Sequence, residues 1–346
     1  MNGPIDDTGA RSRRRATATT ALGLALLAVV ALGLLSGAVA ASPADLFHML
    51  GGRLGITDDP ARLTDSVLWA IRMPRVLSGL VVGVGLGAAG AALQGTFRNQ
   101  MADPHLVGIS AAAGLGAVAG IALTPIGGPP VIMMVGAAVG AVAAALLMRR
   151  IARRVIESSQ FILVGLALGL AMLAWLGAIV LAWDSPRVPT FAFWVFGGLA
   201  GSTWSTLGAG TPFVLAGLAI VAGSARSLDL LALGEAEAQH VGVDVDRVVA
   251  VILVGVGLSV GGAVALGGAI GFVGLIAPLI LRSWIGPTHR WLVPLAALAG
   301  AMIVVAVDVS ARTVAAPVEI PVGLLTAILG APVFVWFLLR VGRSGT

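Results

Sequence analysis

The sequence predicts an all-α, polytopic membrane protein with about ten transmembrane helices, one of them short or broken. Three observations predict this fold class. The 346 residues are 58% hydrophobic and only 11% charged, whereas soluble domains carry about 25% charged residues. Apolar stretches of roughly 20 residues, the length that a helix needs to cross a bilayer, recur along the chain. The loops between these stretches alternate between many and few arginines.

Nine long apolar stretches and one short stretch define the expected helices. The long ones are residues 16–40, 76–97, 105–124, 130–148, 160–182, 205–225, 248–268, 291–311 and 321–340. The short one, 270–282, follows Gly267-Gly268, contains Pro278 and would reach only about 20 Å as a helix. Irregular backbone at membrane depth is tolerated only where protein or a water-filled cavity covers it. We therefore expect residues 270–282 to be a broken helix inside the bundle.

The second stretch, 76–97, is unusually rich in glycine. Only three of its residues are polar, and six are glycines: Gly79, Gly83, Gly85, Gly87, Gly90 and Gly95. Association of helices in lipid depends on close packing, which small residues permit. We expect this helix to lie inside the bundle, with its backbone close to other helices.

The distribution of arginine predicts the topology, with both termini cytoplasmic. Fifteen arginines fall in the loops that would face the cytoplasm and six in those that would face outward, as the positive-inside rule requires. The inner ones are Arg11, Arg13, Arg14, Arg15, Arg98, Arg149, Arg150, Arg153, Arg154, Arg226, Arg247, Arg282, Arg290, Arg340 and Arg343; the outer ones are Arg53, Arg62, Arg72, Arg75, Arg187 and Arg312. Residues 1–15 are then a cytoplasmic tail and 16–346 one transmembrane domain. A cleavable signal peptide is the alternative for the N-terminus, but an apolar run of about 25 residues exceeds the usual 7–15.

Composition and motifs exclude most catalytic chemistry. There is no cysteine and every basic residue is arginine, so thiolate metal sites and the phosphate-binding lysine of a P-loop are excluded. The four histidines (His48, His105, His240 and His289) are scattered in loops or at helix ends, where solvation is expected, and none has metal-ligand spacing. We expect no catalytic residues, no metal site and no cofactor. The net charge of +5 reflects topology and does not indicate nucleic-acid binding.

Charged residues near the outer ends of the predicted helices are candidates for a functional site. Asp308 is the exceptional intramembrane carboxylate, and it is expected to pair with Arg312, four positions later on the same helix face. Arg72, Arg75 and Arg312 fall on the face where arginine is disfavoured. If exposed, they could bind the carboxylates of a partner; interfacial snorkelling is the alternative.

Residues 226–247 form the longest polar stretch expected on the cytoplasmic side. Glu237 and Gln239 favour a helix there, and Gly234 and Gly242 stand where a helix would begin and end. A short exposed helix between two crossings is a lever that another protein could hold. A solvated loop is the alternative.

Taken together, the motifs resemble those of the permeases of FecCD-type ABC importers, which carry ferric siderophores, haem or cobalamin across the bacterial inner membrane. The resemblance covers nearly everything from residue 66 onward. It is carried by Arg72-Met-Pro-Arg75, the Gly79–Gln94 helix, Arg98-Asn99 with Ala102 and Pro104, Gly108-Ile109-Ser110, Phe193-Trp194 with Gly197 and Trp204, Gly234 to Gly242, Gly271 to Pro278 with Arg282, and Glu319-Ile320-Pro321-Val322-Gly323 leading to Gly330-Ala331-Pro332.

The resemblance implies partners and residue roles. A second permease, identical or related, would complete the path, with two ATPase subunits beneath and an extracytoplasmic substrate-binding protein above. Arg72, Arg75 and Arg312 would dock the binding protein. Asn99 and Met101, with Ser158 and Ser159, would form a cytoplasmic gate, although Gln100-Met101 replaces the family's Pro-Leu and Leu279 its histidine. Coupling to the ATPase would fall to Leu233, Gly234, Glu235, Ala236, Glu237, Ala238, Gln239, His240, Val241, Gly242 and Val243.

The expected function is therefore ATP-driven import of an iron chelate, a ferric siderophore first, with haem or cobalamin as alternatives. The chain has no Walker motif, so ATP hydrolysis would lie on another subunit, and the chain itself is not an enzyme. An ion-coupled secondary carrier is the alternative, although such a carrier usually needs more buried carboxylates than this chain offers. A membrane anchor or sensor without transport is a third possibility.

Overall fold

The computed structural model describes residues 6–37, 39–56, 63–123, 128–153, 158–182 and 188–343. Every regular element in these residues is a helix. Ten helices coincide with the ten predicted apolar stretches, in the same order. They are α1 (Asp6–Leu35), α4 (Met73–Thr96), α5 (Ile109–Ala122), α6 (Pro130–Ala152), α7 (Ser158–Ala182), α9 (Trp204–Gly223), α12 (Val245–Gly267), α13 (Val273–Ile285), α14 (His289–Thr313) and α15 (Val322–Arg343).

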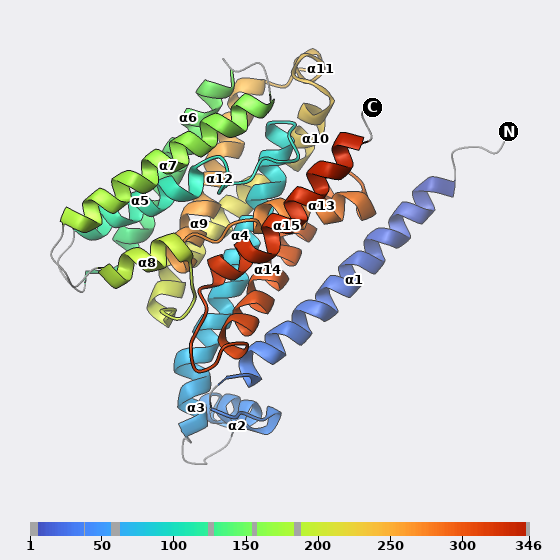
Figure 1. Cartoon of the computed structure of the whole chain (residues 1–346). Coiled ribbons are helices and arrows are strands. Elements are labelled where there is room, and N and C mark those ends of the chain that lie inside the picture. Colours follow the sequence, from blue (N-terminus) through green and yellow to red (C-terminus); the bar gives the residue numbers. More distant parts are fainter. Residues whose placement is uncertain are drawn as a thin grey trace.

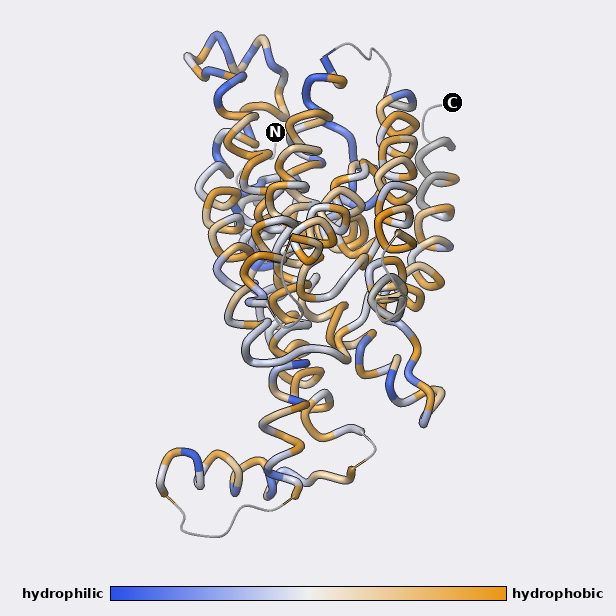
Figure 2. The backbone as a smooth tube through the Cα atoms, turned by 90° about the vertical axis from the view of Figure 1, so that its left-hand side faces the viewer, coloured by the Kyte–Doolittle hydropathy of each residue, from blue (hydrophilic) through white to orange (hydrophobic). Residues whose placement is uncertain are grey.

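Length and hydropathy support a membrane location for this bundle. Among the described residues, seven helices are long and apolar enough to cross a membrane, and α5, α13 and residues Val322–Trp336 of α15 are shorter apolar helices. Figure 2 shows hydrophobic residues along the helices and most hydrophilic ones toward the two ends of the bundle. The all-α, polytopic fold with a short broken helix is thus confirmed.

Short helices lie at the two ends of the bundle (Figure 1). At one end are α2 (Pro43–Arg53), α3 (Leu63–Val67) and a π-helical turn, η1 (Leu68–Arg72); at the opposite end are α10 (Ala225–Leu233) and α11 (Glu235–His240). We call these the α2 end and the α11 end. The short helix α8 (Val188–Phe196) was not expected from the sequence. The first helix begins at Asp6, so residues expected in a separate tail continue the helix that crosses the membrane.

Helix α4 is the centre of the bundle. It packs against α9, α12, α13 and α14, while α1 lies at the side against α14 and α13 (Figure 1). The glycines of α4 explain this position, because a Cβ at Gly83 would meet the Gly300 carbonyl, one at Gly87 the Ala296 carbonyl and one at Gly90 the Gly274 carbonyl. The expected close approach of other helices to α4 is confirmed.

The chain leaves the helical conformation between α12 and α13, at the predicted break. Gly268 and Phe272 have positive φ angles of 68° and 66°. The backbone of this break is covered by protein: the Gly198 amide donates to the Gly267 carbonyl at 2.8 Å, and Gly323 lies against the Ala269 carbonyl. Irregular backbone is thus placed where the bundle can satisfy it.

Candidate functional site

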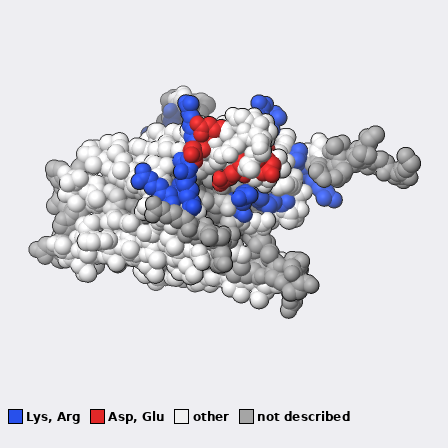
Figure 3. All heavy atoms as spheres, turned by 90° about the horizontal axis from the view of Figure 1, so that it is seen from above, with Lys and Arg blue, Asp and Glu red and all other residues white. Residues whose placement is uncertain are grey.

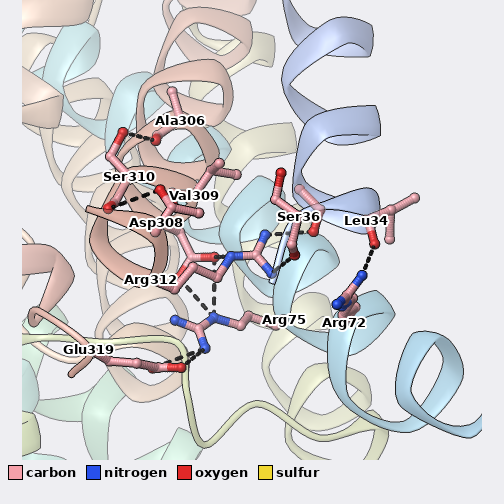
Figure 4. Close-up of polar contacts among 12 residues, drawn as sticks. Leu34, Ser36, Arg72, Arg75, Ala306, Asp308, Val309, Ser310, Arg312 and Glu319 are labelled. Atoms are coloured by element: carbon pink, nitrogen blue, oxygen red, sulfur yellow. Dashed lines mark hydrogen bonds and ion pairs between the residues drawn. The ribbon is translucent and has the colours of Figure 1, made fainter. Parts of the chain in front are cut away.

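An arginine cluster lies at the α2 end, where α4 begins and α14 ends (Figure 4). Arg75 donates from Nε to Asp308 Oδ1 at 2.9 Å, and from Nη1 to both carboxylate oxygens of Glu319 at 3.0 and 3.1 Å. Arg312 Nε lies 3.5 Å from Asp308 Oδ2, one turn earlier on α14. The expected pairing of Asp308 with Arg312 is confirmed, and the structure adds Arg75 and Glu319 to it.

The other two arginine contacts run to the carboxyl end of α1. Arg72 Nη1 donates to the carbonyls of Leu34 at 2.8 Å and Leu35 at 3.1 Å, and Nη2 to that of Val39. Arg312 Nη1 and Nη2 donate to the carbonyls of Ser36 at 3.2 Å and Gly33 at 2.5 Å. The last carbonyls of a helix have no partner within it and carry its negative dipole end. Arg72 and Arg312 therefore cap α1 and fasten its end to the bundle.

These three arginines are buried in this structure, so the exposure that the docking interpretation supposed is not found. Only 4% of Arg72, 7% of Arg75 and 9% of Arg312 is exposed. The reason is that each guanidinium has partners far away in the sequence: α1 carbonyls for Arg72 and Arg312, and carboxylates from α14 and the α14–α15 connection for Arg75. The role of these residues in docking a partner remains a prediction.

At the α11 end, the predicted lever is a distinct helix. The segment from Leu233 to Val243 contains α11, preceded by Gly234 at φ 137° and followed by Gly242 at φ 88°. Ala238 is buried, which places α11 against the bundle, and the Val243 amide donates to the Ala238 carbonyl at 3.0 Å, which closes the turn after α11. Leu233 and Val241 are each 71% exposed. Figure 3, seen from this end, shows acidic and basic side chains together on the face.

A polar cavity of about 680 Å³ adjoins α11. Its lining includes three arginines, Arg98, Arg149 and Arg153, and three carboxylates, Glu235, Glu237 and Asp246. Asp246 pairs with Arg149 at 2.7 Å and with Arg153, which joins the ends of α6 and α12. The cavity separates α11 from the α4 and α6 ends, so α11 has polar space beside it.

The predicted gate residues lie in two segments that meet near this end. Asn99 Oδ1 accepts from the Met101 amide at 2.9 Å, after Arg98 at a positive φ of 47°. Ser158 and Ser159 begin α7, and their side chains lie outside the described residues. The rings of Phe97 and Phe161, 4.5 Å apart, show that the two segments are neighbours.

A buried carboxyl adjoins the first gate segment. Asp103 Oδ1 accepts from the amides of His105 at 2.8 Å and Leu106 at 3.3 Å. Burial raises the pKa of this carboxyl above its ordinary value, while His105 beside it pulls the pKa down. The carboxyl braces the turn between α4 and α5 through these backbone bonds.

One further residue pair was missed by sequence reasoning. His289, expected to be solvated like the other histidines, is fully buried at the start of α14. Its Nδ1 lies 2.9 Å from Asp229 Oδ1 of α10, and its backbone amide donates to the same oxygen at 2.6 Å. The pair joins the helix that leads into α11 to the start of α14. No local pattern signals it, because sixty positions separate the two residues.

Comparison with known proteins agrees with this architecture. Residues 25–340 match the FecCD transport family. The chain is 39% identical to the hemin transport system permease protein HmuU of Yersinia pestis, over 80% of this chain and 85% of the relative. It is 36% identical to the vitamin B12 import system permease protein BtuC of Vibrio cholerae, over 85% and 90%.

A solved structure described as an inward-facing conformation of a metal-chelate type ABC transporter aligns with a TM-score of 0.77 and 28% identity, covering 93% of this chain and 98% of that one. The family match extends over the arginine cluster, the gate segments and α11 alike. The chain therefore belongs to the FecCD transport family and is a multi-pass permease of an ABC importer.

Proposed function

We propose that this permease imports a bulky metal chelate, working with a second permease subunit, two ATPase subunits and an extracytoplasmic substrate-binding protein. The named relatives carry hemin and vitamin B12, and the solved neighbour is of the metal-chelate type. Haem and cobalamin both hold a metal ion in a macrocycle with four nitrogen ligands. A ferric siderophore, the substrate favoured by the sequence resemblance, stays a prediction beside them.

In this proposal the α11 end faces the cytoplasm and both termini lie there. The support is the excess of arginine in the loops of that end, fifteen residues against six. The α2 end then faces outward, where Arg75, with Arg72 and Arg312 beside it, receives the binding protein. Asn99, Met101, Ser158 and Ser159 form the inner gate.

The observation that carries the proposal is the geometry of α11. A six-residue helix stands between two glycines with positive φ, holds to the bundle through one buried alanine, and exposes Leu233, Val241 and its glutamates. This is an attachment point for an ATPase subunit, offering an apolar anchor with charged neighbours. The chain has no nucleotide-binding motif of its own, so the energy of ATP must enter through such a contact.

Movement of α11 has a physical route into the bundle. Only Gly234 separates α10 from α11, and Asp229 on α10 bonds to His289 at the start of α14. Helix α14 packs along α4, the central helix. A displacement of α11 by the ATPase would therefore move α10 and α14 together and tilt the helices around α4.

The test is a charge reversal on the lever, Glu235→Arg with Glu237→Arg, in proteoliposomes containing the permease, the ATPase and the binding protein. Uptake of haem, cobalamin and a ferric siderophore is measured separately, which also identifies the substrate. We expect the reversal to lower uptake at least tenfold and to remove stimulation of ATP hydrolysis by the loaded binding protein. The charge-conserving pair Glu235→Asp with Glu237→Asp is the control.

Normal stimulation of ATP hydrolysis in the reversed variant would refute the coupling role. Sustained uphill uptake by the permease alone, driven by an ion gradient without ATP, would refute the importer mechanism in favour of a secondary carrier.

A further inference from the structure

Arg75 is the one member of the arginine cluster whose described side-chain partners are all carboxylates of its own chain. Asp308 takes Nε, and Glu319 takes Nη1 through both of its oxygens (Figure 4). Charge-assisted bonds from a guanidinium N–H to carboxylate oxygens are also the means by which arginine recognises a carboxylate on another protein. The site that a partner's glutamate would use is thus already filled by a glutamate of this chain.

The two carboxylates differ in how firmly they are held. The Asp308 side chain is 1% exposed and lies on α14, between Arg75 and Arg312. The Glu319 side chain is 47% exposed and belongs to the connection between α14 and α15. Replacing Asp308 would leave buried charge unpaired, which is costly. Glu319 can turn outward into water at little cost, because an exposed ion pair is weak.

The neighbouring arginines offer no such exchange. The described contacts of Arg72 are carbonyls at the end of α1 and that of Val39 just beyond it, and Arg312 divides its bonds between carbonyls at the end of α1 and Asp308. A partner's carboxylate that took either guanidinium would leave helix-end carbonyls without donors. Of the groups bound to this cluster, Glu319 is the one that can leave while every buried group keeps a hydrogen-bond or ion-pair partner.

We propose that Glu319 is a built-in substitute for a partner's carboxylate, and that the binding protein docks by displacing Glu319 from Arg75. The inference rests on the docking role proposed above. Exchange of one carboxylate for another keeps Arg75 paired throughout, so the cluster is never left as a bare buried cation. The apparent affinity for the partner equals the intrinsic affinity multiplied by the fraction of molecules in which Glu319 does not occupy Arg75.

The experiment measures the dissociation constant of the binding protein encoded with this permease, using the intact permease–ATPase complex in nanodiscs. The variants are Glu319→Gln, Arg75→Gln and the double variant. We expect Glu319→Gln to bind about twofold to fivefold more tightly than wild type, the factor that a half-exposed ion pair is worth. Arg75→Gln should bind more weakly. The double variant should match Arg75→Gln, because Glu319 then has no site to compete for.

The double variant is the matched control, since it carries the same loss of negative charge on the same face. Tighter binding from Glu319→Gln in both backgrounds would mean a general charge effect and would overturn the proposal. Unchanged affinity of Glu319→Gln beside weakened Arg75→Gln would overturn the competition while leaving docking at Arg75 in place. Unchanged affinity of Arg75→Gln would overturn the docking role itself, and the inference with it.

Discussion

Asp308 lies between two guanidinium groups in a part of the molecule that excludes water. Arg75 and Arg312 both approach it, and 1% of its side chain is exposed. A buried ion pair contributes little net stability over an apolar replacement, but the removal of one partner leaves an unpaired charge that costs several kcal/mol. The two buried arginines therefore need this carboxylate to balance their charge.

We predict that Asp308→Asn destabilises the protein by about 3 kcal/mol. Arg75 would keep Glu319, but Arg312 would keep only the α1 carbonyls. The measurement is the thermal midpoint of the detergent-solubilised permease without any partner. Ser310→Ala is the control, because its hydroxyl bonds only to the Ala306 carbonyl of the same helix. Equal midpoints for Asp308→Asn and wild type would contradict the assignment.

The Asp229–His289 pair has a role at the opposite end. One carboxylate oxygen of Asp229 binds both the ring and the backbone amide of His289. We predict that Asp229→Leu, which keeps a similar size without any acceptor, loosens α10 from α14. More ATP should then be hydrolysed per substrate molecule imported, because movement of α11 is no longer passed on fully.

The ratio of phosphate released to substrate accumulated in proteoliposomes is the readout. Ser283→Ala, which loses only a bond to the Ile280 carbonyl of its own helix, is the control at the same end. An unchanged ratio for Asp229→Leu, with normal expression, would show that the pair is merely structural.

Among the elements, α4 and α13 show how small residues determine helix packing. Gly90 faces the Gly274 backbone so closely that a side chain at Gly90 has no room, and a Cβ at Gly274 would lie only 2.9 Å from the Leu86 carbonyl of α4. Such contacts replace the hydrophobic drive that helices lack in lipid. The central place of α4 depends on this row of glycines.

We predict that Gly90→Ala lowers the stability of the detergent-solubilised permease by about 1–3 kcal/mol, the usual cost of overpacking. Gly208→Ala on α9 is the matched control, since a Cβ there meets no atom within 4 Å; its free energy of unfolding should stay within about 0.5 kcal/mol of wild type. If the two alanine variants unfold at the same temperature, close packing at Gly90 is not the cause of helix association here.

The elements were also the most predictable part of the protein. The ten apolar stretches became helices because a membrane leaves the backbone no other local way to satisfy its hydrogen bonds. Gly267-Gly268 and the shortness of the next stretch indicated the break before α13. The short helix α11 followed from helix-forming residues between Gly234 and Gly242.

The partners of individual charges were not predictable in the same way. The sequence placed Arg72 and Arg312 near one face, but their burial depends on carbonyls of α1, more than 30 and 270 positions away. His289 and Asp229 were likewise read as separate polar residues. A local pattern carries no information about such pairs, because only the packing of helices brings them together.

At the scale of the whole molecule, one end of α1 is firmly attached to the rest of the bundle. At the α2 end it is fastened by Arg72 and Arg312, and Gly33 lies against Val76 and Val305. We predict that a disulfide between Gly33→Cys and Val305→Cys forms readily and leaves transport intact, because α1 and α14 already move as one unit there. The natural chain has no cysteine, so the engineered pair is the only one.

The readout compares uptake before and after oxidation, with cross-linking followed by gel mobility. The single variants Gly33→Cys and Val305→Cys, treated in the same way, are the controls. Loss of uptake that returns on reduction would show that α1 separates from α14 during transport.

Helix α14 holds His289 at one end and Asp308 nineteen residues later, about 28 Å along a helix that rises 1.5 Å per residue. One helix therefore carries two polar junctions, one toward each proposed partner. Thermodynamic linkage makes any communication along it symmetrical: if nucleotide on the ATPase changes the affinity for the binding protein by some factor, the binding protein must change the affinity for nucleotide by the same factor.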